Sequence, residues 1–362
     1  MSTLLLPGLI DPHVHLRDPG QTEKEDFLTG TSAALAGGFT TIIDMPNNIV
    51  PITTSGALEE KIASAKTKAV CDVGFYFGSL GDNLEEFENV QDKVLGLKLF
   101  LNHTTGNFLL NPNALEKIFK AWPSPPAGGS PILFHAENET FDLVLNVLKK
   151  HPRPIHLCHL STSYELKKVM EAKKEGLPVT CGVTPHHLFL TKEDEQKLGP
   201  LGQMKPALQS REEVEFLWEH LDTIDVIESD HAPHLLSEKN SGPPAGGTFY
   251  GVPGLETTLP LLLTAVNEGR LTTDDIVRLC HTNPSRIFHI PVDPTSKTEV
   301  DPDEEWVITN ENLQTKCKWS PFNGWKIKGK VKRVFLRGEK VFENGTVLAK
   351  PGSGMIILPQ LL

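Results

Sequence analysis

Hydrophobic and polar positions follow a regular rhythm along the first three quarters of the chain. Short apolar runs rich in β-branched residues alternate with longer segments that have helical periodicity. The short runs predict strands at Leu4–Ile10, Thr40–Asp44, Val70–Phe77, Leu95–Leu101, Pro131–His135, Ile155–Cys158, Val179–Val183 and Thr223–Glu228. The longer segments predict helices, among them Lys24–Ala36, Leu58–Lys66, Thr140–Lys150, Tyr164–Lys174, Arg211–Leu221 and Leu255–Val266.

Eight nearly continuous apolar strands, most of them followed by a helix, indicate a parallel sheet that is covered on its outer face. An eight-fold (β/α) barrel of the TIM type needs roughly 250 residues, and the stretch from Leu4 to about Asn267 supplies them. A doubly wound open sheet is the alternative α/β fold. The number of strands favours the barrel.

The pattern changes after about Pro284. Asp293–Trp306 is acidic and contains proline, and it is followed by short strand-like runs at Trp306–Ile308, Lys326–Lys332, Val334–Leu336 and Val341–Glu343. These runs predict a small β-subdomain. We therefore expect a barrel over residues 1–290 and a C-terminal β-rich subdomain, packed on the barrel, over residues 291–362. Ser237–Gly254 is rich in Gly, Pro and Ser and predicts a loop.

Composition narrows the class of protein. A formal net charge of −11 over 362 residues disfavours a nucleic-acid partner, although a local basic pocket for a small anion remains open. Five widely spaced cysteines without a CxxC motif are typical of a reducing cytoplasm. No run has the length and apolarity of a membrane span, and Leu4–Ile10 lacks the basic leader and cleavage site of a signal peptide.

Several ionisable residues lie where the predicted strands end. His13 and His15 follow the first strand, and residues two apart in an extended segment share a face. His135, His159 and Asp230 end later strands. In a barrel the carboxyl ends of all strands meet at one mouth, where barrel enzymes have their active sites.

Lys98 is the most unusual of these residues because it lies inside a predicted strand between leucines. An ammonium group buried there is costly unless it is paired, deprotonated or chemically modified. A carbamate formed with CO₂ would turn the cation into an anionic ligand that can bridge two metal ions.

Each residue also has a simpler interpretation, such as a structural histidine or a helix cap for Asp230. Together, however, four histidines, one lysine and one aspartate at one rim indicate a binuclear metal site. Imidazole and carboxylate ligands suit zinc, with manganese and iron as alternatives. A hydroxide held by two metals is a strong nucleophile at neutral pH. Asp230 would bind one metal and exchange a proton with that hydroxide and with a leaving nitrogen.

A set of motifs then connects the chain with a known family. PGLIDPHVHLRDPG, AALAGGFTT, DMPNN, GLKLFLN, HAEN, HLCH, GLPVTCGVTPHHLFL, SDHAPH and GVPGLETTLPLLLTAV span nearly the whole sequence. They resemble the dihydroorotases of the amidohydrolase superfamily, most of all the dihydroorotase domain of animal multifunctional pyrimidine-synthesis proteins. The resemblance implies reversible, zinc-dependent cyclisation of N-carbamoyl-L-aspartate to L-dihydroorotate, a step of UMP biosynthesis.

The resemblance also implies roles for individual residues. Two Zn²⁺ ions per chain would be bridged by carboxylated Lys98 and a hydroxide, with His13, His15 and Asp230 on one ion and His135 and His159 on the other. The substrate would be bound by Arg17, Asn47, His234, Lys205, Pro253 and Gly254, the first three of which would hold its carboxylate. Asn102–Phe108 matches the mobile catalytic loop of the family, in which Thr104 and Thr105 would touch the substrate.

Some positions depart from the pattern of the family. Lys205-Pro-Ala-Leu-Gln209 stands where many relatives have Asn-Pro-Pro-Leu-Arg, so one wall of the pocket differs. Gly182 stands where animal-type domains carry a glutamate, so an accessory metal site that uses that acid near Cys158 is not expected. His186 and His187 are expected beside the metal ligands and not among them.

Two other functions remain open. A related cyclic amidohydrolase, such as an allantoinase or a dihydropyrimidinase, would share the metals but would not need to grip a substrate carboxylate. An inactive barrel that serves only as an assembly scaffold is the second. The resemblance further implies a homodimer, with aspartate transcarbamoylase or carbamoyl-phosphate synthetase as neighbouring domains or partners.

Overall fold

The computed structural model describes residues 3–104, 108–123, 130–242 and 248–360. Its centre is a parallel barrel formed by two hydrogen-bonded sheets, in the orders β2-β3-β4 and β10-β9-β8-β7-β6-β5. The strands are β2 (Leu9–Val14), β3 (Phe39–Asp44), β4 (Asp72–Phe75), β5 (Phe77–Gly78), β6 (Leu97–Phe100), β7 (Ile132–His135), β8 (Ile155–Leu157), β9 (Val179–Val183) and β10 (Val226–Ile227).

The two sheets join at both of their ends. Only Tyr76 separates β4 from β5, so these two pieces occupy one strand position of the barrel. On the other side, a parallel bridge links Val14 of β2 to His231 just after β10, and the His15 N–H donates to the His231 carbonyl at 2.8 Å. Eight strand positions therefore form a closed ring, which confirms the predicted (β/α)₈ barrel and excludes the open sheet.

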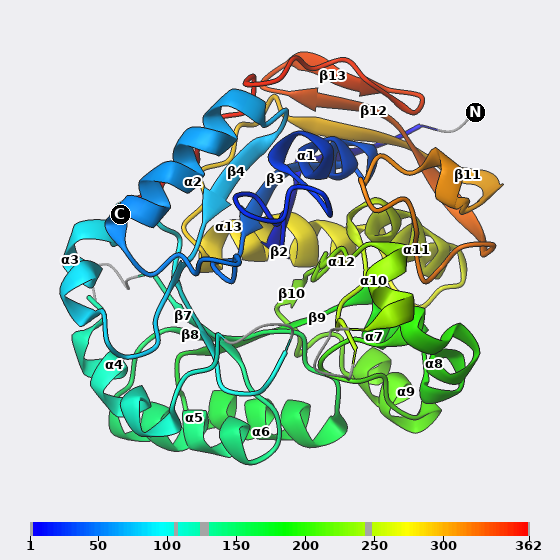
Figure 1. Cartoon of the computed structure of the whole chain (residues 1–362). Helices are drawn as coiled ribbons and strands as arrows, with labels where there is room; N and C mark the ends of the chain where they lie inside the picture. The colour runs from blue at the N-terminus through cyan, green and yellow to red at the C-terminus, as the bar shows by residue number, and fades with distance from the viewer. Residues whose placement is uncertain (1–2, 105–107, 124–129, 243–247, 361–362) are drawn as a thin grey trace.

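Helices surround the strands (Figure 1). They are α1 (Phe27–Ala36), α2 (Ser55–Lys68), α3 (Phe87–Val90), α4 (Leu115–Ala121), α5 (Glu139–Lys150), α6 (Ser163–Lys174), α7 (Pro185–Phe189), α8 (Lys192–Leu198), α9 (Arg211–Glu219), α10 (Leu236–Ser241), α11 (Leu255–Asn267), α12 (Thr273–Val277) and α13 (Asn283–Ile287). N-capping side chains determine the residue at which several of these helices begin. The helix predicted from Lys24 begins at Phe27 because Asp26 accepts the Thr29 N–H as its N-cap.

The interior of the barrel is an apolar cluster that includes Ile10, Ile43, Tyr76, Leu133 and Val226. A second and larger cluster fills the layer between strands and helices. The C-terminal tail closes the amino-terminal end of the barrel. A bridge pairs Val73 at the start of β4 with Ile356, and the side chain of Ile357 packs into the interior cluster.

An antiparallel sheet of order β1-β11-β12-β13-β14 packs beside the barrel. Its strands are β1 (Leu4–Pro7), β11 (Lys297–Val307), β12 (Lys326–Leu336), β13 (Glu339–Glu343) and β14 (Thr346–Val347). In Figure 1 the orange and red strands of this sheet lie above the blue first strands of the barrel. Contacts between α11 and β12 are among those that hold the sheet against the barrel.

The prediction of one strand over Leu4–Ile10 is wrong. Leu4–Pro7 pairs with β11 of the small sheet, and only Leu9–Val14 belongs to the barrel. The chain passes from one sheet to the other at Gly8. A larger residue would be too crowded there, because its Cβ atom would lie 2.4 Å from the Thr40 hydroxyl. Apolar periodicity cannot show which sheet an apolar run joins. The boundary predicted at residues 290 and 291 stays a prediction.

Within the described residues, none of the helices combines the length and the apolar character that a membrane span requires.

Candidate active site

The predicted ionisable residues gather at the carboxyl ends of the barrel strands. They surround a cavity lined by His13, His15, Arg17, Asn47, Phe100, Thr104, His135, His159, Lys205, Asp230, Ala232, Tyr250 and Gly251. His13 lies within β2 and His135 ends β7, while His159 and Asp230 lie in the short segments that follow β8 and β10. Strands that are far apart in sequence thus bring these side chains to one mouth.

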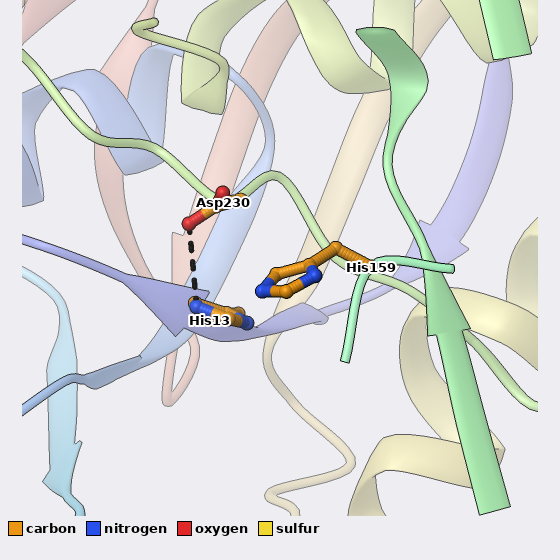
Figure 2. Close-up of side chains that lie close together, drawn as sticks. All are labelled: His13, His159 and Asp230. Atoms are coloured by element: carbon orange, nitrogen blue, oxygen red, sulfur yellow. Dashed lines mark ion pairs between the residues drawn. The ribbon is translucent and has the colours of Figure 1, made fainter. Parts of the chain in front are cut away.

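His13, His159 and Asp230 form the centre of the cluster. Their potential ligand atoms lie within 4.8 Å of one another. Figure 2 shows the two imidazoles facing Asp230, with the contact from His13 Nε2 to Asp230 Oδ1 at 3.2 Å drawn as a dashed line. His15 Nε2 lies 3.0 Å from the same oxygen. Asp230 Oδ1 is therefore shared by both histidines of the HxH pair.

His135 extends this cluster to the next strand. Its Nδ1 lies 3.1 Å from His159 Nε2, so two ring nitrogens point at one another across a small gap. Its other nitrogen lies 3.1 Å from the Glu137 carboxylate. A metal ion between two such nitrogens would replace a contact between imidazoles with two coordinate bonds.

Lys98 is completely buried between these histidines and the barrel interior. Its Nζ lies 3.1 Å from Cys158 Sγ and 4.9 Å from the centre of the Phe100 ring. Neither partner neutralises the ammonium, since burial raises the pKa of the Cys158 thiol to about 12. The burial predicted for Lys98 is confirmed.

The protonation states of the cluster are those that bind metals. Burial lowers the pKa of His15 to about 3 and lowers the pKa values of His135 and His159, so these rings are neutral at pH 7. Burial alone would raise the pKa of Asp230, but its electrostatic interactions with the neighbouring imidazoles of His13 and His15 hold that pKa well below its ordinary value. Neutral imidazoles and an ionised carboxylate form a donor set that fits zinc.

The backbone is strained where these residues lie. Arg17, His159 and Asp230 have φ values of +63°, +39° and +45°, a backbone region that residues other than glycine rarely occupy. Such conformations cost about 1–3 kcal/mol each and persist where the surrounding structure enforces them. The fold is therefore less stable than it would be without these strained residues, but their side chains are directed into the cavity.

Arg17 lines the cavity, whereas His234 is not part of the lining and contacts Arg17. The Arg17 Nη2 atom is 3.3 Å from His234 Nε2, and its Nε donates to the Pro233 carbonyl at 3.2 Å. Both side chains are buried. Asn47 contacts a histidine of the cluster, with its Oδ1 2.6 Å from His15 Nδ1.

Another wall of the cavity contains Lys205, whose Nζ lies 5.3 Å from the centre of the Tyr250 ring. Buried Lys239 holds this wall in place because its ammonium donates to the carbonyls of Gln203, Phe249 and Gly251 at 2.7–3.1 Å. The segment around Lys205, which departs from the pattern of the family, is therefore held in place by hydrogen bonds within the protein.

Four other predicted residues occupy different places. Thr104 lines the cavity, whereas Thr105 lies outside the described residues. Pro253 and Gly254 line a small neighbouring cavity together with His231, and the Gly254 N–H donates to His231 Nδ1 at 3.2 Å. In the main cavity, Tyr250 and Gly251 lie where the sequence analysis expected Pro253 and Gly254.

Sequence reasoning missed Glu228, which is buried beneath the histidines. Its carboxylate lies 3.2 Å from His13 Nδ1, and it forms with His13 and Cys158 a second group of potential ligands within 4.8 Å of one another. The signal was present, because Glu228 precedes Asp230 by two residues, as His13 precedes His15. Phe100, Ala232, Tyr250 and Gly251 were also missed, and no sequence pattern marks them.

Comparison with known proteins yields one consistent group. The profile described as "Amidohydrolase family" matches residues 4–341. The chain is 46% identical to Multifunctional protein CAD of Squalus acanthias over 96% of its own length, but it spans only 15% of that protein. It is 38% identical to the dihydroorotase of Pyrococcus furiosus, over 98% of this chain and 85% of the relative.

Solved structures agree with these relatives. An L-hydantoinase (dihydropyrimidinase) from Arthrobacter aurescens superposes with a TM-score of 0.92 at 27% identity, over 98% of this chain and 89% of that chain. The inactive dihydroorotase-like domain of the Chaetomium thermophilum CAD-like multifunctional protein superposes with a TM-score of 0.82 at 28% identity, over 98% and 99% of the two chains.

Proposed function

Because this chain belongs to the amidohydrolase family, we propose that it is a dihydroorotase, a hydrolase that opens and closes a cyclic amide. The observation that carries the substrate assignment is the buried pair of Arg17 and His234 beside the histidine cluster. Dihydroorotate carries a carboxylate next to its ring, and an arginine fork matches a carboxylate with two parallel hydrogen bonds. Hydantoin and dihydrouracil rings have no such group.

We propose two zinc ions as the cofactors. His13, His15 and Asp230 would hold one ion, His135 and His159 the other, and Lys98 would bridge them as a carbamate. The complete burial of Lys98 beside Cys158 supports this modification, since carboxylation replaces a costly buried cation with an anion. When bound, the metals activate a water molecule at neutral pH and polarise the carbonyl of the substrate.

Asp230 is the proposed general acid and base. In ring opening, the water oxygen forms a bond to the ring carbonyl carbon and the C–N bond breaks. Asp230 accepts the proton of the attacking water and delivers it to the departing nitrogen, which gives N-carbamoyl-L-aspartate. Ring closure reverses these steps and releases water. The ionised state of Asp230 and its position on the cavity wall support this role.

The remaining predicted residues would bind the substrate. Arg17, Asn47 and His234 would hold its carboxylate, and Lys205 would donate from another wall of the cavity. Thr104 and Thr105 would close over the bound ring. Pro253 and Gly254 would act from behind Tyr250 and Gly251, which form the surface of the cavity there.

Substrate comparison tests the proposal. Purified, zinc-loaded protein should open L-dihydroorotate far faster than dihydrouracil, hydantoin or allantoin. Asp230→Ala should lose at least about 10²-fold in kcat, within the typical contribution of a positioned acid–base group. Faster turnover of allantoin or dihydrouracil would replace dihydroorotase with one of those related activities, and unchanged ring opening by Asp230→Ala would refute the mechanism.

An inactive scaffold is the second candidate, because one structural neighbour is described as an inactive dihydroorotase-like domain. This chain retains all six expected ligand side chains, and five of them line one cavity with Lys98 buried beneath them. Elemental analysis separates the two functions. About two zinc ions per chain support the enzyme, whereas fewer than one would favour the scaffold.

We also propose a cytoplasmic homodimer that works in UMP synthesis beside aspartate transcarbamoylase and carbamoyl-phosphate synthetase, as neighbouring domains or as separate partners. Relatives named as multifunctional proteins support this setting. Light scattering of the purified chain tests the dimer, and a monomeric mass would exclude it.

A further inference from the structure

We propose that Glu228 is a positioning residue that fixes one histidine ligand of each metal, His13 for the first ion and His159 for the second. The inference rests on the proposed metal centre and extends it. Glu228 is completely buried and its two carboxylate oxygens point at different histidines. It therefore acts through the ligands and does not touch the substrate cavity, whose lining does not include it.

The first contact determines the tautomer of His13. Glu228 Oε2 lies 3.2 Å from His13 Nδ1. A carboxylate only accepts hydrogen bonds, so Nδ1 must carry the hydrogen and donate it. The other nitrogen, Nε2, then presents its lone pair toward Asp230, 3.2 Å away, where a metal would lie between them. A carboxylate behind a ligating histidine orients the ring and raises its basicity.

The second contact holds the backbone of His159. Glu228 Oε1 accepts the His159 N–H at 2.6 Å. His159 has a φ of +39°, a conformation that relaxes unless its surroundings enforce it. The hydrogen bond from the backbone to a buried anion is of the charge-assisted kind, roughly twice as strong as a neutral one. Glu228 thereby keeps the His159 ring directed at His135.

Gly182 provides the space for this carboxylate. Gly182 of β9 pairs with Val226 of β10, so it lies beside the strand from which Glu228 projects. A Cβ atom at residue 182 would lie 2.5 Å from Glu228 Oε1. Residue 182 itself carries no acid. The structure supplies an acid to the same place from the end of β10.

The sharpest test is Glu228→Gln, which preserves the shape of the side chain. Its amide oxygen would accept the His159 N–H, so its NH₂ group would face His13 and donate to Nδ1. His13 would then carry its hydrogen on Nε2 and could not ligate through it. We expect a loss of about 10–100-fold in affinity for the first zinc, the usual effect of removing such a partner. Competition of the apoprotein against a chromogenic chelator measures this affinity without substrate.

Asp225→Asn is the matched control. Asp225 lies just before β10, accepts the Cys181 N–H and pairs with Lys173, so it is also a carboxylate that holds a neighbouring strand. Its replacement should lower the thermal midpoint of the apoprotein without a change in zinc affinity. Gly182→Ala provides a second route, because its methyl group displaces Glu228 while the carboxylate stays in the chain. This variant should lose zinc affinity in the same way as Glu228→Gln.

Two results would overturn the proposal. Zinc affinity of Glu228→Gln equal to that of Asp225→Asn would show that Glu228 supports only the fold. A third zinc ion per wild-type chain that is absent from Glu228→Gln would make Glu228 a metal ligand, together with His13 and Cys158. Failure of the proposed function would look different. In that case zinc affinity would still depend on Glu228, but the wild-type protein would not open the dihydroorotate ring.

Discussion

At the scale of single residues, Arg17 combines three unusual properties. It is buried, it has a positive φ, and its guanidinium contacts a histidine and a carbonyl instead of an acid. Asp230, Asp44 and Glu238 favour its charge only through space, so a substrate carboxylate in direct contact would offset the cost of burying the cation. These properties fit the proposed role of Arg17 in binding the substrate carboxylate.

Arg17→Gln should therefore act on substrate binding. Loss of charge-assisted hydrogen bonds worth about 1.5–3 kcal/mol predicts an increase of roughly 10–100-fold in the KM for dihydroorotate. Initial rates over a range of substrate concentrations measure the effect. Arg153→Gln is the control, because Arg153 is a buried arginine that donates to the Phe119 and Trp122 carbonyls away from the cavity. Equal KM values in the two variants would contradict the assignment of Arg17.

The sequence showed the charged residues of the site more readily than its shape. His13, His15, Lys98, His135, His159 and Asp230 stand out because strand ends in a barrel converge and because charge in an apolar strand is costly. Phe100 and Tyr250 line the same cavity without such a signal. Their contribution depends on the path of loops, which local periodicity does not encode.

At the scale of elements, α6 illustrates how a helix start is tied to the site. Glu165 accepts the backbone N–H groups of Ser161 and Thr162, and Thr162 accepts the Glu165 N–H in return, which completes a capping box. The capped turn directly follows His159. Burial raises the pKa of Glu165 from its ordinary value of 4.5 to about 7.

This raised pKa predicts a pH dependence of stability. The folded protein binds the Glu165 proton more tightly than the unfolded chain, so the contribution is fully present below pH 4.5 and is lost as the pH rises through about 7. Urea midpoints of wild type and Glu165→Gln at pH 5 and pH 8 measure it. The wild type should lose on the order of 3 kcal/mol more than the variant over this interval. Glu171→Gln, an exposed change on the same helix, should behave like wild type, and an identical loss in Glu165→Gln would disprove the assignment.

Element boundaries were predictable where a strong local signal marks them. The helix predicted over Tyr164–Lys174 is Ser163–Lys174 in the structure, because Thr162 caps it. The run Val70–Phe77 was predicted as one strand, and it is interrupted at Tyr76. Leu4–Ile10 failed for a different reason, since partner choice in a sheet depends on residues almost three hundred positions away.

At the scale of the whole molecule, the site and the stability of the barrel lie at opposite ends. The proposed metal ligands occupy the carboxyl ends of the strands, whereas the C-terminal tail packs at the amino-terminal end through Ile356 and Ile357. We therefore expect that mutations at the two ends can change activity and stability separately.

Ile357→Ala tests this separation. A buried isoleucine that becomes alanine leaves a cavity and typically costs about 2–5 kcal/mol, and Ile357 is only 8% exposed. We expect a lower urea midpoint with KM and kcat unchanged. Leu358→Ala on the same tail is the control, because that side chain is 48% exposed and should cost little. A drop in kcat without loss of stability would show that the tail communicates with the site.

The pairing of Leu4–Pro7 with Lys297–Val300 has a consequence for synthesis of the chain. Pro7 leaves the ribosome about 290 residues before its partner Lys297, a wait on the order of 15–60 s at roughly 5–20 residues per second. During that time three successive leucines have no sheet to join, while the first barrel strand beside them already has its neighbour. Pairing of β1 with β11 is thus a late event in the synthesis of the chain, and we expect Leu4–Leu6 to be the nascent segment that benefits most from shielding by a chaperone.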